Sequence, residues 1–238
     1  MFTPPNALKA NTQDSLIWKM LIDRQPALLH KRAAPAFSQG LARLGLRREA
    51  IPDIGELSAT VRAHTGWQLA PVGQPFEPGA FFELLAERRF PIVTRIRPMH
   101  AFDFSPHPDL FHDLFGHVPM LLDEELAEFL HVLGQAYRAQ PVGSAARERL
   151  WALYFFTAEF GLVQHEGQPR LYGAGLLSSA GEIYHCVNEH TPRLAFDLAA
   201  VLRTPVSGAR YQPQYFVLPA WEQLTECVGE LAGLLAHG

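Results

Sequence analysis

The sequence predicts a mainly α-helical protein with a few short β-strands, folded as one domain. Apolar side chains recur every three to four residues along most of the 238-residue chain, the spacing of helices with one buried face. Only two short stretches are rich in β-branched and aromatic residues. No Gly/Ser-rich linker, block of like charge or internal repeat divides the chain. We therefore expect one domain over residues 1–238, with about residues 1–10 as a flexible N-terminal tail.

The helical periodicity predicts the following segments in order. They are about residues 12–31, 35–45, 53–65, 79–88, 108–120, 123–139, 145–165, 178–187, 192–202 and 219–236. Asp53 and Asp123 each stand before such a segment, where a carboxylate can accept hydrogen bonds from the free N–H groups of the first turn. Pro192 suits the first turn of a helix because its missing N–H is not needed there. Short strands are expected at 92–96 and 215–218.

The composition is that of an ordinary globular chain, with 48% hydrophobic and 18% charged residues and a net charge of −4. Mild acidity with scattered arginines argues against a nucleic-acid surface. No run approaches the 18 apolar residues of a membrane span, and no basic start precedes an apolar block, so we expect a cytoplasmic protein without membrane partners. Cys186 and Cys227 stand at no metal-ligand spacing and are expected to be reduced structural thiols.

The most informative motif contains two histidines, His112 and His117, and is followed further along the chain by Glu159. Glu159 lies in the aromatic run 154–160. An ionised carboxylate there costs free energy to bury unless a cation or strong hydrogen-bond donors lie nearby. Two histidines and one carboxylate are the ligands that hold ferrous iron on one face and leave the other face open. The pattern therefore indicates a site for oxygen chemistry.

The spacing of the two histidines leaves alternatives open. Five residues on an ideal α-helix turn through roughly 500°, so the two side chains would point about 140° apart. A metal could still bridge them if Gly116 relaxes the helix or if other chain covers the site. Taken singly, each residue also suits an ordinary polar position on an amphipathic helix. A zinc hydrolase is disfavoured because Asp113 and the five-residue spacing break the H-E-x-x-H pattern, and a 2-oxoglutarate oxygenase because the periodicity is helical.

Several segments of the chain resemble the pterin-dependent aromatic amino acid hydroxylases, and they occur in the same order as in that family. These segments are 65–67, 81–91, 106–119, 154–162, 172–179 and 211–217. The likeness covers nearly the whole chain, and the motif around His112 and His117 is specific. The chain looks like the short bacterial form of the family, of the type that hydroxylates phenylalanine. The resemblance implies a single catalytic domain without the regulatory domain and tetramerisation helix of the animal enzymes.

The resemblance also implies cofactors and a set of residues that bind them. His112, His117 and Glu159 fall at the positions of the iron ligands, and they are therefore the expected catalytic centre. Phe81 falls where the family stacks an aromatic ring against the pterin, a suitable use of one flat ring for another. Asp113 and Tyr154 match positions near the metal and the pterin. The expected cofactors are Fe(II) and a tetrahydropterin, with O₂ as co-substrate.

The residues implied for the substrate belong to a separate set. Arg97 falls at the family's arginine for the amino-acid carboxylate, where a guanidinium fork suits two oxygens. The other implied substrate residues are Ser105, Pro106, Asp109, Phe155 and Ser178. The implied reaction is hydroxylation of the ring of a free aromatic amino acid. We expect L-phenylalanine to be converted to L-tyrosine.

Two departures from the family pattern keep an alternative substrate open. Phe155 stands where phenylalanine and tyrosine hydroxylases usually carry Trp, and a smaller ring there would leave space for an indole. Tryptophan hydroxylation is therefore the alternative activity, and a catalytically silent amino-acid or pterin-binding module is a weaker one. His107 replaces an acidic residue between two prolines. The expected partners are the small molecules alone and a separate pterin-recycling enzyme, and a monomer is expected because no heptad tail follows.

Overall fold

The computed structural model describes residues 12–74, 77–208, 210–224, 226–227 and 230. The expected N-terminal tail and half of the expected helix 219–236 lie outside these residues. The described part is mainly helical with a few short strands, so the predicted fold class is confirmed. Within it, no helix is both long and apolar enough to cross a membrane.

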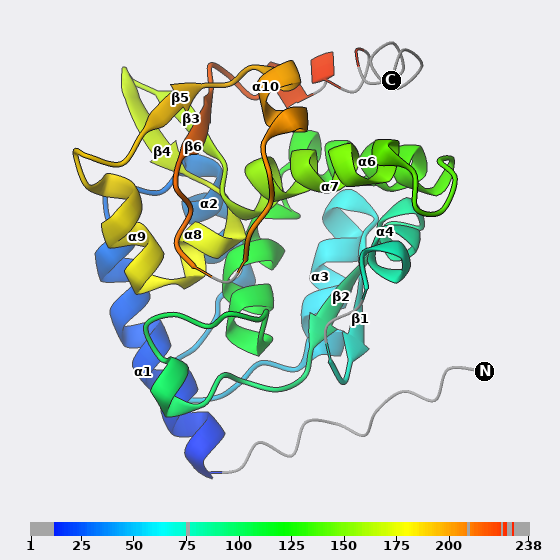
Figure 1. Cartoon of the computed structure of the whole chain (residues 1–238). Helices are drawn as coiled ribbons and strands as arrows, with labels where there is room; N and C mark the ends of the chain where they lie inside the picture. The colour runs from blue at the N-terminus through cyan, green and yellow to red at the C-terminus, as the bar shows by residue number, and fades with distance from the viewer. Residues whose placement is uncertain (1–11, 75–76, 209, 225, 228–229, 231–238) are drawn as a thin grey trace.

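Helices make up most of the described chain (Figure 1). In order they are α1 (Thr12–Leu29), α2 (Pro35–Leu44), α3 (Ile54–Thr65), α4 (Pro78–Ala86), η1 (Met99–Ala101), η2 (His112–His117), α5 (Val118–Met120), α6 (Glu124–Arg138), α7 (Ala145–Tyr154), η3 (Phe155–Glu159), α8 (Ala174–Ser178), α9 (Ala180–Val187) and α10 (Leu198–Arg203). The predicted caps are present, because the Asp53 and Asp123 carboxylates each accept a backbone N–H at 3.0 Å, from Glu56 and from Leu126.

Two small sheets accompany the helices. The first pairs β1 (Gln68–Val72) with β2 (Arg89–Val93) in parallel. The second has the order β4-β3-β6-β5, in which β6 (Tyr215–Leu218) runs parallel to β3 (Leu162–His165) and to β5 (Arg193–Ala195), and β4 (Gln168–Leu171) runs antiparallel to β3. The strand at 215–218 was predicted, and the one expected at 92–96 is found slightly earlier as β2.

Two of the helix predictions were wrong. The helix expected over 145–165 ends at Glu159, and Gly161 then allows the chain to turn into β3. A Cβ at Gly161 would lie 2.3 Å from the Tyr172 ring, so only glycine permits this close approach. The segment 192–202 begins as β5 rather than as a helix, because the Pro192 carbonyl accepts the Tyr215 N–H at 3.0 Å. Helix α10 starts only after Asp197.

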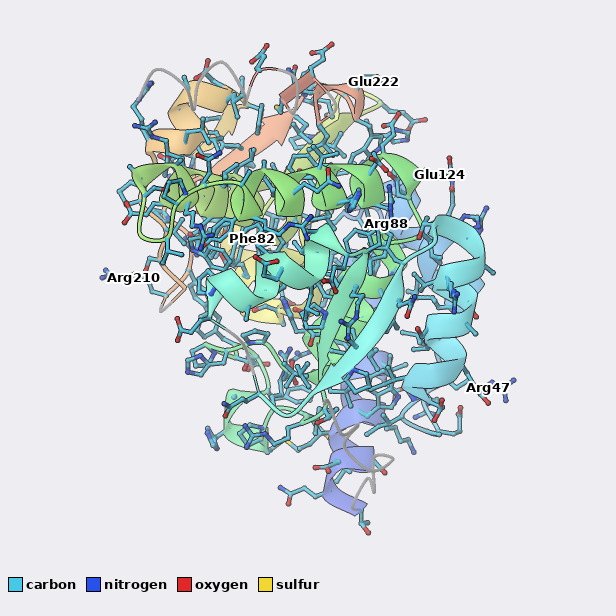
Figure 2. All side chains as sticks on the ribbon, turned by 90° about the vertical axis from the view of Figure 1, so that its right-hand side faces the viewer. Arg47, Phe82, Arg88, Glu124, Arg210 and Glu222 are labelled. Carbon is cyan, nitrogen blue, oxygen red and sulfur yellow. The ribbon has the colours of Figure 1, made fainter. Side chains whose placement is uncertain are left out.

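The core lies where α6 crosses α4 and where η2 passes through the centre of the molecule. Figure 2 shows Phe82 between α4 and α6, and its buried ring stacks on Tyr137 with a centroid distance of 4.0 Å. The central green segment of Figure 1 contains η2, and α8 packs against it. Gly116 of η2 makes this contact possible, since a Cβ there would lie 2.9 Å from the Cβ of Ala174. The packing therefore holds η2 against α8 within the core.

Candidate metal centre and its cavities

His112 and His117 lie on η2, which is a π-helical turn rather than α-helix. Its hydrogen bonds join residues five apart, as in the bond from the Val118 N–H to the Asp113 carbonyl. Residues five apart therefore lie one above the other, whereas they would point about 140° apart on an α-helix. The two Nε2 atoms are 3.1 Å apart. The helix is therefore wound differently over His112–His117, the segment that contains Gly116, in agreement with the first of the two alternatives that the spacing left open.

A second π-helical turn, η3, positions the carboxylate. It continues α7, and the Phe160 N–H donates to the Phe155 carbonyl five residues earlier at 3.0 Å. Glu159 thereby lies one turn beyond Tyr154, whose hydroxyl donates to Glu159 Oε1 at 2.8 Å. Glu159 Oε1 lies 3.1 Å from His117 Nε2, and Glu159 Oε2 lies 3.4 Å from His112 Nε2.

These three side chains fit a metal ion. Two ligands at right angles, each about 2.1 Å from a metal, are about 3.0 Å apart, close to the measured separations. Within the described part of the chain, His112, His117 and Glu159 form the group whose ligand atoms lie close enough together to hold a metal ion, all within 4.8 Å of one another. Two histidines and one carboxylate on one face are characteristic of non-haem iron. The donor set and its spacing therefore agree with Fe(II).

The three side chains set one another's charge. Burial disfavours a charge on His112, but the carboxylates of Glu159, Asp113 and Asp109 together outweigh burial and raise the pKa of His112. For His117 burial dominates, and the pKa is lowered. Burial would raise the pKa of Glu159, yet the two imidazoles hold that pKa well below its usual range. The arrangement favours a carboxylate facing one protonated imidazole, and a metal cation can take the place of that proton.

Polar partners fix the orientation of His112. Its Nδ1 lies 2.9 Å from the Ser178 hydroxyl, and its backbone N–H donates to Asp109 at 3.0 Å. Asp109 also accepts two hydrogen bonds from the Arg97 side chain, at 2.8 and 3.0 Å, and Arg97 donates to the Ser178 carbonyl at 3.2 Å. Arg97 holds the pKa of Asp109 below its usual value although burial opposes this. A ligand histidine supported in this way keeps its ring in one direction.

Asp113 links η2 to the sheet formed by β1 and β2. Its carboxylate accepts the Val93 N–H at 2.6 Å, and burial raises the pKa of Asp113 to about 8. Tyr154 is likewise buried, and burial followed by the nearby Glu159 charge raises its pKa well above the usual value. Both groups are therefore expected to hold their protons more firmly than they would in water.

Two cavities meet at His112 and Glu159, two of the three candidate ligands. The Arg97 cavity, about 310 Å³, is lined by five of the residues expected to contact substrate. These are Arg97, Ser105, Pro106, Phe155 and Ser178. Asp109 lies behind Arg97 and is 5% exposed, so it orients the guanidinium rather than lining the cavity. The Ser105 hydroxyl donates to the His107 carbonyl at 2.7 Å.

The second cavity is smaller and more aromatic. The Phe81 cavity, about 90 Å³, is lined by Phe81, Asp113 and Tyr154, the residues expected to bind a pterin, together with all three candidate ligands. The rings of Phe81 and Tyr154 pack edge to face with centroids 4.9 Å apart. The structure thus groups the expected residues into two adjacent sets, one on each side of the metal centre.

Trp151 and Glu182 are among the lining residues that were not anticipated from the sequence. Trp151 lines both cavities, and its position one helical turn before Phe155 was the available signal. Glu182 lines the Arg97 cavity and is 1% exposed. Its Oε1 accepts hydrogen bonds from the Gln212 N–H at 3.0 Å and from the Tyr215 hydroxyl at 2.5 Å. No local pattern distinguishes Glu182 from a solvated glutamate.

The fold and the site together place the chain in a class of proteins. These proteins are mainly helical and carry a centre of two histidines and one carboxylate beside two cavities. Residues 6–236 match the family described as biopterin-dependent aromatic amino acid hydroxylase. The chain is 41% identical over 210 residues to a phenylalanine-4-hydroxylase of Vibrio cholerae, covering 87% of this chain and 72% of that protein. The chain belongs to the biopterin-dependent aromatic amino acid hydroxylases.

Solved structures support the same assignment. The structure resembles the apo form of a cold-active phenylalanine hydroxylase from Colwellia psychrerythraea, with a TM-score of 0.91 and 35% identity over 99% of this chain and 92% of that one. It also resembles the phenylalanine hydroxylase of Chromobacterium violaceum with bound iron(III) and oxidised 7,8-dihydrobiopterin. That match has a TM-score of 0.89 and 36% identity, and covers 96% of this chain and 84% of the other.

Proposed function

We propose that the protein is an iron- and tetrahydropterin-dependent hydroxylase that converts free L-phenylalanine to L-tyrosine. The observation that carries this proposal is the triad of His112, His117 and Glu159 at the junction of two cavities of different character. The relatives that are 36–41% identical over 87–94% of this chain carry the name phenylalanine-4-hydroxylase. Their names favour phenylalanine over tryptophan as substrate.

His112, His117 and Glu159 would hold Fe(II) through Nε2, Nε2 and the carboxylate. When bound, the iron and the pterin supply the activation of O₂. The Ser178 hydroxyl and the Asp109 carboxylate would keep the His112 ring in its ligating direction. The π-helical turns would keep all three donors on one side and leave the other open.

The Phe81 cavity would accept the pterin. Phe81 offers a ring face for stacking, and the Asp113 and Tyr154 side chains add polar groups to an otherwise apolar wall. Because the three ligands belong to the same wall, a pterin in this cavity would lie beside the metal. We assign no acid or base to the chain in this step.

The Arg97 cavity would hold the amino acid. Arg97 is buried, and part of its hydrogen-bonding capacity is used by Asp109 and Ser178. Its remaining N–H groups would bind the substrate carboxylate. Phe155 and Phe160 line the same cavity, so the substrate ring would lie against aromatic rings that exclude water.

The proposal is tested by anaerobic reconstitution with Fe(II), followed by addition of O₂ and tetrahydropterin. Phenylalanine, tryptophan and tyrosine are supplied together, and products are identified by mass and chromatography. Pterin-dependent formation of tyrosine from phenylalanine is expected. Hydroxylation of tryptophan alone would replace the substrate assignment, and no hydroxylation despite bound iron would contradict the proposed activity.

We also propose a cytoplasmic monomer that depends on a separate enzyme to regenerate its pterin. Cys186 and Cys227 are buried free thiols, and burial raises the pKa of each to about 12, which suits a reducing compartment. A monomeric mass by light scattering is the expected result. Multiple turnovers per pterin are expected only when a recycling enzyme is added.

A further inference from the structure

Trp151 occupies the place where the cavities meet. Four residues line both the Arg97 cavity and the Phe81 cavity, namely Pro108, His112, Trp151 and Glu159. Two of these are candidate metal ligands, so Trp151 is the one large apolar side chain that the two described cavities share. It also lines a third, more open groove of about 780 Å³ between α7 and α10.

The Trp151 ring is held in place on three sides. It stacks on Tyr154 with centroids 5.6 Å apart and planes 20° apart, and it meets the buried Phe82 ring edge to face at 6.1 Å. On the cavity side it lies 6.3 Å from Phe155, with planes 47° apart. Two of these neighbours are nearly fully buried, so the indole cannot turn aside without disturbing the core.

The positions of these rings determine how much space lies beside Phe155. Residues 151 and 155 are one helical turn apart, so their side chains project to the same side. A larger ring at position 155 would overlap the space that Trp151 fills, whereas the smaller Phe155 leaves that space to Trp151. The absence of an indole at position 155 therefore does not by itself enlarge the Arg97 cavity.

We propose that Trp151 sets the size of the amino-acid cavity, as the wall that limits the substrate ring and separates it from the pterin cavity. This inference rests on the proposed function and adds a specificity-determining residue to it. Shortening Trp151 opens the wall towards the Phe81 cavity and the outer groove. A bicyclic ring then fits where only a single ring fitted before.

The test compares Trp151→Leu and Trp151→Phe with the wild type. We measure kcat/KM for phenylalanine and tryptophan in competition, and the binding of each amino acid to the metal-free protein by equilibrium dialysis. In Trp151→Leu the tryptophan-to-phenylalanine ratio of kcat/KM should rise at least about tenfold, within the range that pocket size controls. Trp151→Phe should change it in the same direction by less. Adding Phe155→Trp to Trp151→Leu should restore the preference for phenylalanine.

Trp221→Leu is the matched control, because Trp221 packs on Tyr172 and lines none of the three cavities described. Its ratio should equal that of the wild type. An unchanged ratio in Trp151→Leu that retains iron overturns the inference and leaves the proposed function intact. If Trp151→Leu does not fold, the tryptophan-to-phenylalanine ratio of kcat/KM in Trp151→Phe tests the inference in its place, and an unchanged ratio overturns it. Wild-type protein that hydroxylates no amino acid would instead defeat the proposed function, and dialysis would still test the cavity size.

Discussion

Glu159 is half-buried among aromatic rings, and its carboxylate lies within 3.4 Å of two imidazole nitrogens and accepts a hydrogen bond from Tyr154. The residue types at 112, 117 and 159 indicated a metal site, and the resemblance to the hydroxylase family implied that these three residues are its ligands. The same level of reasoning missed Trp151 and Glu182. Their places in the cavity walls depend on distant parts of the chain, and the only local signal was the position of Trp151 one helical turn before Phe155.

The ligand assignment predicts loss of iron on single substitutions. His112→Ala and Glu159→Ala each remove one of three donors, so iron should no longer survive gel filtration and hydroxylation should fall to background. Helical content should stay near that of the wild type. The measurements are metal content by atomic absorption, tetrahydropterin-dependent product formation and circular dichroism.

His190→Ala and Glu189→Ala serve as matched controls, since the two side chains are 86% and 87% exposed. Both should retain iron. Full iron content in either ligand variant would show that another side chain supplies the donor.

At the scale of the elements, the long amphipathic segments were predicted well because a buried helix face repeats over several turns. The strands β1, β3, β4 and β5 were missed, since runs of three to five residues give little periodicity. The π-helical turns could not be predicted either. Hydrophobic periodicity indicates a helix, but one added residue within a turn scarcely alters it.

The close contact between η2 and α8 gives a prediction at this scale. Gly116→Ala would place a Cβ 2.9 Å from the Cβ of Ala174 and 3.0 Å from its carbonyl oxygen. Alanine favours a helix by up to about 1 kcal/mol, but overpacking of a buried contact costs about 1–3 kcal/mol. We expect a lower free energy of unfolding in urea and weaker iron retention.

Gly73→Ala is the comparison, because no atom lies within 4 Å of a Cβ built there. It should leave both quantities unchanged. Wild-type stability in Gly116→Ala would mean that α8 can shift away from η2.

For the whole molecule, Glu182 connects parts of the chain that are distant in sequence. From α9 it accepts hydrogen bonds from Gln212 and from Tyr215 in β6, while its buried Oε2 has no partner among the described residues. Burial outweighs these hydrogen bonds and raises the pKa of Glu182 above the ordinary 4.5. Ionisation of this side chain therefore opposes folding.

The raised pKa of Glu182 determines how its contribution to the free energy of unfolding changes with pH. Because the folded protein holds the Glu182 proton more tightly than the unfolded chain, this residue favours folding most below pH 4.5, and its contribution declines as the pH rises above that value. Glu182→Gln cannot ionise, so its free energy of unfolding should decline less between pH 4.5 and 8. Urea unfolding across this range measures the difference. Glu189→Gln, changed at an exposed side chain, should follow the wild type, and identical pH profiles for all three proteins would disprove the assignment.

The two π-helical turns also bear on how such a centre could arise. A π-turn within a longer helix holds one more residue than the α-helical turn it replaces. Residues four apart share a face of an α-helix, so an ancestral α-helix with histidines at that spacing would already have directed both to one side. A single codon inserted between them would give the five-residue spacing of His112 and His117, and the π-turn keeps both side chains on that side, so the ligand pair depends on the winding of the helix as much as on side-chain identity.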